Sequence, residues 1–177
     1  MSLDGVIESS SMGEWYLPFH SDERADIIRN TILDTDIMVY GRETYEMLES
    51  YWPSLKNNEM GVADKLNQVK KYVVSTTLKK ASWANTSIIE KDVVSKIKQL
   101  KSESGNQIMI DGSATLVHSL IGTGLIDEFQ FLVHPYYMGT GKNFYQIVAA
   151  KMPLYLKEVK EISLGVVLLR YGTAAGS

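Results

Sequence analysis

The chain has 177 residues, of which 45% are hydrophobic, so it can bury a substantial core. Eighteen lysines and arginines against twenty-one aspartates and glutamates give a net charge of -3, which argues against sequence-independent binding of nucleic acid. Cysteine is absent, which excludes disulfides and thiolate metal sites, and no apolar stretch approaches the roughly twenty residues of a membrane span. We expect a soluble cytoplasmic protein without a signal peptide, with one domain over residues 1–172 and a disordered tail over residues 173–177.

The first half of the chain alternates between helix and strand patterns. Residues 1–13 are predicted to be loop, and a helix is predicted over Asp22–Leu33 with Ser21 as its cap. A buried strand over residues 37–40 then ends at Gly41, which opens a helix to about Ser50. The pattern next predicts a loop over 51–59, a short helix over 62–68, strands over 71–75 and 86–90, and an amphipathic helix with apolar positions Val93, Val94, Ile97 and Leu100.

The second half changes character after Gly124. Before it, Ile108–Ile110 is a predicted strand, and a helix with Leu116 and Leu120 on one face follows almost at once. Strands are then predicted over residues 126–134, 154–162 and 166–171, with no helix between them. Alternating strands and helices predict a parallel sheet, whereas the strand-rich end predicts antiparallel pairing. We therefore expect an α/β fold with a mixed, mostly parallel sheet and helices on both faces.

Ligands of such sheets bind beyond the C-terminal ends of the parallel strands, so the strand-to-helix junctions are the candidate sites. At the first junction, Gly41 lets the backbone turn sharply, and Arg42 and Thr44 occupy the first helical turn. Amides and the positive end of the helix dipole favour an anion there, and the Thr44 hydroxyl adds a donor. The alternative is a solvated arginine at an ordinary helix start.

Two further junctions carry donors. At the second, Gly112 permits close approach of the backbone, and amides and hydroxyls follow at Ser113, Ala114 and Thr115. Asp111 could instead cap that helix. At the third, the hydroxyls of Ser75 and Thr76 follow a strand, although such residues are also common in ordinary loops.

Together the junctions predict a site for several phosphates, and hence for a dinucleotide cofactor. The prediction requires the corners at Gly41 and Gly112 to lie side by side, so that exposed amides of both hold one diphosphate. Rival motifs fail: "GTGKNF" at 139–144 lacks the flanking residues of a phosphate loop, and the three histidines share no metal-ligand spacing. No metal site is predicted.

Several short motifs occur in an order that resembles a known family. They are "SLDG" (2–5), "GRETYE" (41–46), "YWP" (51–53), "KYVVSTTL" (71–78), "DGSATLVHSL" (111–120), "GLIDEF" (124–129) and "HPYYMGTGKNFY" (134–145). The chain resembles the dihydrofolate-reductase-like family over nearly its whole length. It is most similar to the branch shared with the C-terminal reductase domain of the riboflavin-pathway deaminase–reductases. The resemblance implies that family's three-layer sandwich.

The resemblance also implies NADPH as cofactor. It assigns the 2′-phosphate or diphosphate to Arg42 with Gly41 and Thr44, and the adenosine side to Ser75 and Thr76. The remaining diphosphate contacts fall to Gly112, Ser113, Ala114 and Thr115.

Substrate residues follow from the resemblance too, each with a structural alternative. Asp4 matches a position near the substrate pocket, or it forms a simple Asp-Gly turn. Asp22 or Glu23 would supply a carboxylate at the helix start, or cap that helix. Asp4 and Asp22 are thus the candidate catalytic carboxylates, which could orient substrate or relay a proton through water. Trp15 could stack on a flat ring and Trp52 could border the pocket, or each belongs to the core.

The activity implied is hydride transfer from NADPH to a small heterocyclic substrate, as in a 5-amino-6-(5-phosphoribosylamino)uracil reductase of riboflavin biosynthesis. The alternatives are a dihydrofolate reductase and a non-catalytic NADP(H)-binding module. A homodimer is expected by resemblance. Family members usually place an apolar strand before "SLDG", whereas Met1 directly precedes Ser2 here, so either this sequence omits a segment or the sheet lacks a strand. We also expect no deaminase domain within these 177 residues.

Overall fold

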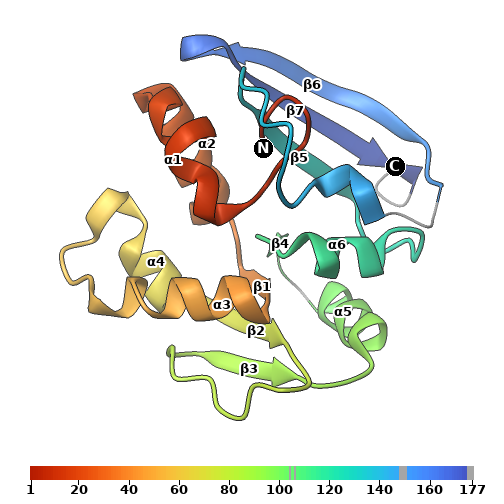
Figure 1. Cartoon of the computed structure of the whole chain (residues 1–177). Coiled ribbons are helices and arrows are strands. Elements are labelled where there is room, and N and C mark those ends of the chain that lie inside the picture. Colours follow the sequence, from red (N-terminus) through yellow and green to blue (C-terminus); the bar gives the residue numbers. More distant parts are fainter. Residues whose placement is uncertain (104, 106, 148–150, 175–177) are drawn as a thin grey trace. The chain divides into compact units, whose positions relative to one another are not determined.

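In a computed structural model that describes residues 1–103, 105, 107–147 and 151–174, the chain divides into two compact units (Figure 1). The parallel unit comprises Ile28–Ser119, and the antiparallel unit comprises Met1–Ile27 with the chain from Leu120 onward. The sequence predicts one domain over residues 1–172. The two-unit division arises because the strands form two separate hydrogen-bonded sheets, each with its own dense set of contacts.

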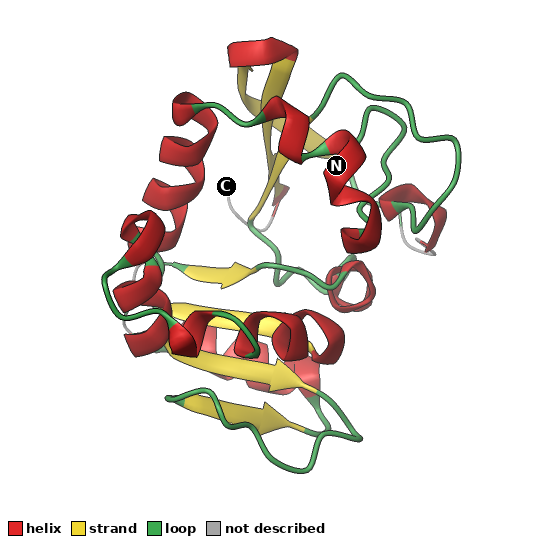
Figure 2. Cartoon of the chain, turned by 60° about the vertical axis from the view of Figure 1, so that its left-hand side comes forward, coloured by secondary structure: helices red, strands yellow, loops and turns green. Residues whose placement is uncertain are grey.

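The parallel unit contains four strands in the order β3-β2-β1-β4. All pairings are parallel, and the arrowheads of this sheet that are visible in Figure 2 point the same way. Pairing of Gly41 with Val74 and of Val39 with Ile110 brings the C-terminal ends of β1, β2 and β4 to one edge of the sheet. The strands span β1 Ile37–Gly41, β2 Lys70–Val74, β3 Thr86–Ile89 and β4 Ile108–Ile110.

Helices cover both faces of this sheet (Figure 2). The crossover from β1 to β2 and the crossover from β3 to β4 run in opposite directions, so right-handed connections place their helices on opposite faces. The strand order therefore reverses between β1 and β4, which is the position where such sheets bind ligands. The helices are α3 Arg42–Glu49 and α4 Ala63–Gln68 on the first crossover, α5 Val93–Ser102 on the second, and α6 Ala114–Leu120 after β4.

The core of the parallel unit is largely aromatic and aliphatic. Tyr40 and Tyr45 are fully buried, and both rings lie near the ring of Trp83. The other buried members are Ile32, Met38, Trp52, Val62, Ala63, Leu66, Val69 and Val73.

The antiparallel unit holds a three-stranded sheet in the order β5-β7-β6. Its strands are β5 Glu128–Val133, β6 Leu154–Ile162 and β7 Val166–Thr173. One face packs Ile162, Val166 and Leu168 against Phe19, Ile27 and Leu132. The remaining elements of the chain are α1 Met12–Trp15 and α2 Asp22–Leu33, with short 3-10 turns at Ser9–Ser11, Leu17–Phe19, Trp52–Ser54, Glu59–Gly61, Phe144–Ile147 and Ser163–Gly165.

The α/β fold class predicted from the sequence is confirmed. Every predicted helix and strand is present, and its observed ends differ from the predicted ends by no more than two residues. Ser21 caps α2, because its hydroxyl accepts the amide of Arg24 at 3.2 Å. Two expectations were wrong. The strands form two sheets in place of one mixed sheet, and residues predicted as loop near 12–13 and 52–54 adopt short helical turns, which have no periodic signal.

The disordered tail predicted over residues 173–177 is wrong at its first residue. Thr173 is the last residue of β7, pairs with Leu154 and is buried. Residues 175–177 lie outside the described residues. Among the described residues, no helix has the length and apolar character to cross a membrane.

Candidate functional site

The two glycine corners at Gly41 and Gly112 lie side by side, as predicted. The amide of Gly41 donates to the carbonyl of Gly112 at 3.2 Å. This bond continues the ladder between β1 and β4, in which Val39 pairs with Ile110. The first and second junctions therefore form one continuous corner at the switch point of the parallel sheet.

Side chains at these glycines would collide with the opposite junction. A Cβ built on Gly41 would lie 2.5 Å from the Ser113 hydroxyl, and one on Gly112 would lie 3.1 Å from that of Thr44. Gly112 also has a φ of 76°, a conformation that other residues rarely adopt, and its peptide bond to Ser113 is cis. The corner thus brings two hydroxyls against backbone that carries no side chain.

The Gly41 amide is committed to the Gly112 carbonyl, so Gly41 contributes the sharp turn and not a donor for an anion. The amides of Arg42 and Thr44 belong to the first turn of α3 and have no acceptor within the helix. Gly41 offers no capping side chain, and the structure records no side-chain cap for this helix in the described part of the chain. These first-turn amides are therefore the donors available for an anion at this junction.

Arg42 lies at this helix start with its side chain 41% exposed. Its guanidinium pairs with Glu46 at 2.8 Å and with Glu43 at 3.6 Å. Both carboxylates belong to the same exposed surface of α3, where ion pairs are worth little. An anionic ligand with more than one negative charge could therefore displace them at small cost.

Ser113, and not Asp111, caps α6. The Ser113 hydroxyl accepts the amide of Leu116 at 3.4 Å, and its carbonyl accepts that of Val117 at 3.1 Å. Ala114 is buried beneath the turn, whereas Thr115 is exposed beside it. The hydroxyls of Ser113 and Thr115 therefore lie at the start of α6, whereas the Ala114 side chain is buried.

At the third junction, formed by Ser75 and Thr76, the Ser75 hydroxyl already has hydrogen-bond partners within its own turn. The Ser75 hydroxyl accepts the amides of Leu78 at 2.9 Å and Thr77 at 3.1 Å, and its own amide donates to Ile89. Ser75 is buried, while the neighbouring Thr76 is exposed. The register between β1 and β2 sets this turn at the same edge of the sheet as the glycine corner.

Asp4 holds a loop of the antiparallel unit. Its carboxylate accepts the Ser2 hydroxyl at 2.7 Å and the amides of Gly139 at 2.8 Å and Met138 at 3.1 Å. These hydrogen bonds, led by that from Ser2, lower the pKa of Asp4 to about 2. Asp4 thus has the structural role of an anchor, and its catalytic role stays a prediction.

The other predicted substrate residues have different surroundings. Glu23 pairs with Lys160 at 2.7 Å and accepts the amide and hydroxyl of Ser163, which ties α2 to the β6–β7 hairpin. Trp15 is 5% exposed, and its indole donates to Ser11. Trp52 is likewise buried, as a core residue of the parallel unit. Both tryptophans are therefore core residues in this structure, which was the alternative to a role in the substrate pocket. Asp22 is exposed in the first turn of α2.

A buried polar cluster was not found from the sequence. Arg24 is 2% exposed; its guanidinium donates to the Tyr16 carbonyl at 2.7 Å and lies 3.1 Å from Nε2 of His134. Burial lowers the pKa of His134 to about 4, so the imidazole is neutral at pH 7 and can accept that bond. Nothing in the local sequence distinguishes Arg24 from a surface arginine on a helix, because its partners come from distant segments.

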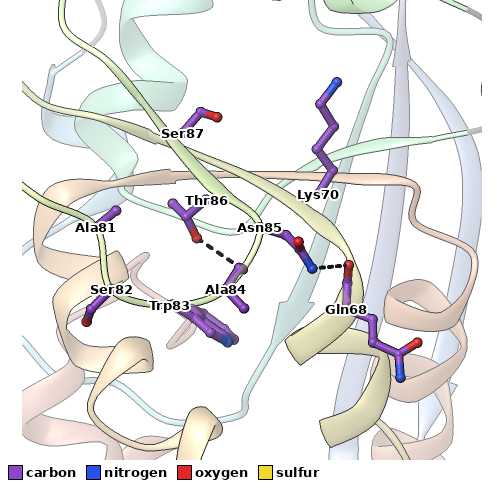
Figure 3. A pocket seen from close by; sticks show the side chains of 9 residues that line it. All are labelled: Gln68, Lys70, Ala81, Ser82, Trp83, Ala84, Asn85, Thr86 and Ser87. Carbon is purple, nitrogen blue, oxygen red and sulfur yellow. Dashed lines mark hydrogen bonds between the residues drawn. The ribbon is translucent and has the colours of Figure 1, made fainter.

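The opposite end of the parallel sheet carries an open cavity of about 590 Å³. Figure 3 shows its lining, where the Asn85 side chain donates to the Gln68 carbonyl at 2.9 Å. The cavity wall around Trp83 is held from beneath by Glu49, whose carboxylate accepts the Ser82 amide at 2.7 Å and the Trp83 amide at 3.0 Å. The lining residues are Gln68, Lys70, Ala81, Ser82, Trp83, Ala84, Asn85, Thr86 and Ser87.

Comparison with known proteins identifies the family. The model of the RibD C-terminal domain matches residues 1–168. The chain belongs to the RibD C-terminal domain family. The chain is also similar to the protein YyaP of Bacillus subtilis (strain 168). The two are 29% identical over 176 residues, which cover 97% of this chain and 90% of YyaP.

Solved structures share the RibD-type fold. A Shewanella sp. PV-4 protein provisionally assigned to riboflavin biosynthesis superimposes with a TM-score of 0.73 at 18% identity, covering 98% of this chain and 94% of that one. Dihydrofolate reductase from Enterococcus faecalis, complexed with NADP(H), has a TM-score of 0.61 at 16% identity and covers 98% and 92%. The dihydrofolate-reductase-like fold expected from the sequence motifs is therefore confirmed.

Proposed function

We propose that this protein is an NADPH-dependent reductase that delivers a hydride to a small heterocycle of the riboflavin-pathway type, similar to 5-amino-6-(5-phosphoribosylamino)uracil reductase. The observation that carries the proposal is the contact between the corners at Gly41 and Gly112 at the switch point of the sheet. Membership of the RibD C-terminal domain family supports the reductase activity. The NADP(H) complex of the Enterococcus faecalis enzyme supports the choice of cofactor.

The residues of the parallel unit suit the phosphates of this cofactor. The first-turn amides of α3 and the hydroxyls of Thr44 and Ser113 would hold the diphosphate, since all lie around backbone that carries no Cβ. Arg42 would take the 2′-phosphate in exchange for its surface carboxylates, and Thr76 would face the adenosine side. Bound NADPH supplies the hydride; the protein contributes binding and orientation.

Asp4 and Asp22 are the candidate carboxylates for proton transfer to the substrate. Asp4 holds its own loop with three hydrogen bonds, and the low pKa of its carboxyl makes it a poor acid near neutral pH. Asp22 is exposed in the first turn of α2, so it is the better candidate to orient substrate or relay a proton through water. Asp22→Asn should lower kcat while leaving the affinity for NADPH unchanged.

A second candidate function is a non-catalytic NADP(H)-binding module. It is favoured by the surroundings of Asp4, Trp15 and Glu23, three predicted substrate residues that contact other parts of their own unit. In that case the parallel unit would bind the dinucleotide without supporting turnover.

Oxidation of NADPH, measured with the aminopyrimidine ribosyl phosphate and separately with dihydrofolate, tests the proposal. We expect turnover with the aminopyrimidine. Turnover with dihydrofolate alone would identify a folate reductase, and tight binding of NADPH without turnover on either compound would favour the binding module. Failure to bind NADPH would contradict both functions.

A further inference from the structure

Arg42, the first residue of α3, shares its guanidinium with a carboxylate one turn further along the helix. Its Nη1 donates to Oε2 of Glu46 at 2.8 Å, and residues four apart lie on the same face of a helix. Oε1 of Glu43 is 3.6 Å from Nη2, beyond hydrogen-bond distance, and the Glu43 side chain is 70% exposed against 43% for Glu46. Glu46 is therefore the carboxylate that holds the guanidinium in this structure.

The order of these two charges along α3 is the less favourable one. A cation at the start of a helix with an anion one turn later opposes the helix dipole, and the reverse order is more stable. The pair is also exposed to solvent, where ion pairs contribute little to folding. The stability of α3 therefore does not depend on the pair, and its main consequence is that any anion reaching Arg42 meets a guanidinium that is already paired.

A carboxylate and a phosphate compete for the same donors of a guanidinium. Both offer oxygens for charge-assisted hydrogen bonds to its planar set of N–H groups. The 2′-phosphate of NADPH therefore has to displace the Glu46 carboxylate before it can pair with Arg42. NADH has a hydroxyl in place of this phosphate, so its binding leaves the pair between Arg42 and Glu46 intact.

We propose that Glu46 is a built-in competitor of the 2′-phosphate, which lowers the affinity for NADPH and narrows the preference for NADPH over NADH. This inference rests on the proposed function, and in particular on the assignment of the 2′-phosphate to Arg42. Because NADP⁺ carries the same phosphate, Glu46 weakens the reduced and the oxidised cofactor alike. It pairs with Arg42 again when either of them leaves.

Glu46→Gln is the direct test, because it keeps the length of the side chain and removes its charge. The affinity for NADPH should rise by about two- to fivefold, the factor that corresponds to an exposed ion pair. Adenosine 2′,5′-bisphosphate, a fragment that carries the same phosphate, should show the same gain. NADH and AMP, which lack the 2′-phosphate, should bind as they do to the wild-type chain. Competition titrations followed by tryptophan fluorescence measure all four ligands.

Two further variants separate this competition from a general effect of charge. Glu90→Gln removes a negative charge at the same edge of the sheet, because Glu90 directly follows β3, and it should change no affinity. In an Arg42→Ala chain, adding Glu46→Gln should leave the NADPH affinity unchanged, because the competitor then has no guanidinium to hold. Thermal unfolding of Glu46→Gln should match that of the wild type, since the pair is exposed.

Three results would overturn the proposal: an unchanged NADPH affinity in Glu46→Gln, an equal gain for NADH, or a full gain in the Arg42→Ala chain. All three leave the proposed function intact, because the wild-type chain binds NADPH in each case. Absence of NADPH binding to the wild-type chain would instead overturn the proposed function and this inference together. The same titrations therefore distinguish the two failures.

Discussion

The two ends of the parallel sheet treat their polar groups in opposite ways. At the C-terminal end, α3 begins after Gly41 without a side-chain cap, and the neighbouring backbone carries no Cβ at Gly112. At the N-terminal end, around the cavity of Figure 3, the Ser82 amide, the Trp83 indole and the Asn85 side chain are paired by the protein itself. The difference separates an end that is suited to a ligand from an end that stabilises the fold.

The N-terminal end is held by two ionisable side chains. Lys71 is fully buried, donates to the carbonyls of Leu66 at 2.7 Å and Val69 at 2.8 Å, and lies 4.6 Å from the ring centre of Trp83. It thereby satisfies carbonyls at the end of α4. The Glu49 carboxylate accepts hydrogen bonds from the amides of Ser82 and Trp83.

The largest expected effect concerns Lys71, at the fixed end. Burial lowers the pKa of Lys71 from its ordinary 10.5 to about 8. Between these values the unfolded chain keeps a proton that the folded chain has lost, so the contribution of Lys71 to stability rises as the pH increases from 8 to 10.5. Lys71→Met removes this dependence.

Urea unfolding of both proteins over that pH range checks the prediction. The difference in unfolding free energy should change by about 3 kcal/mol, at about 1.4 kcal/mol per pKa unit. Identical pH profiles for the wild type and Lys71→Met would show that Lys71 titrates as an ordinary surface lysine.

Gly41→Ala should damage the open end. The new Cβ would lie 2.5 Å from the Ser113 hydroxyl, so the corner must shift, at a cost of about 1–3 kcal/mol in stability. Displacement of the first turn of α3 should weaken NADPH binding by at least about tenfold, a factor that needs only about 1.4 kcal/mol. Thermal unfolding and fluorescence titration measure the two effects.

Two variants control this experiment. Gly13→Ala places a Cβ where no atom lies within 4 Å, so it should change neither property. Adding Ser113→Gly to Gly41→Ala removes the colliding side chain and should restore part of the stability. Full NADPH affinity in Gly41→Ala alone would remove the corner from the binding site.

Glu49→Ala should lower the stability of the fold and leave the affinity for NADPH unchanged. The buried Tyr45 hydroxyl loses its acceptor, and the Trp83 amide keeps only that hydroxyl, at 3.1 Å; an unsatisfied buried donor costs about 1–3 kcal/mol. Met47→Ala, at an exposed position of the same helix, is the control. A drop in NADPH affinity with Glu49→Ala beyond the change in Met47→Ala would mean that the two ends of the sheet are not independent.

Arg42→Ala gives the smallest and most selective effect. Loss of the guanidinium should weaken NADPH by about tenfold and NADH by no more than about twofold, because only NADPH carries the 2′-phosphate. Stability should be unchanged, since the ion pairs of Arg42 are exposed. Competition titrations with the two cofactors measure the ratio, and equal weakening of both would remove Arg42 from 2′-phosphate recognition.

The sequence predicted the open end better than the fixed end. Glycines at strand ends and hydroxyls after them are local signals, and parallel pairing was enough to bring Gly41 and Gly112 together. The hydrogen bond between them was missed because its existence depends on one extra step of the ladder between β1 and β4. The burial of Lys71 and Arg24 could not be predicted, since their partners lie on segments that meet only through tertiary packing.

The substrate residues show the same limit. The "SLDG" motif located Asp4 correctly as a turn residue, but the loop at Met138 and Gly139 that uses its carboxylate lies more than 130 residues away. Trp15 carries no sequence signal that distinguishes a stacking platform from a core residue. Its burial follows from packing near His134.

A crystal structure of the protein soaked with NADPH tests the central claim most directly. The account predicts that the diphosphate accepts hydrogen bonds from the first-turn amides of α3, between Arg42 and Thr44, and lies against the turn at Gly112 and Ser113. A diphosphate bound away from this corner, for instance in the cavity beside Trp83, would contradict it.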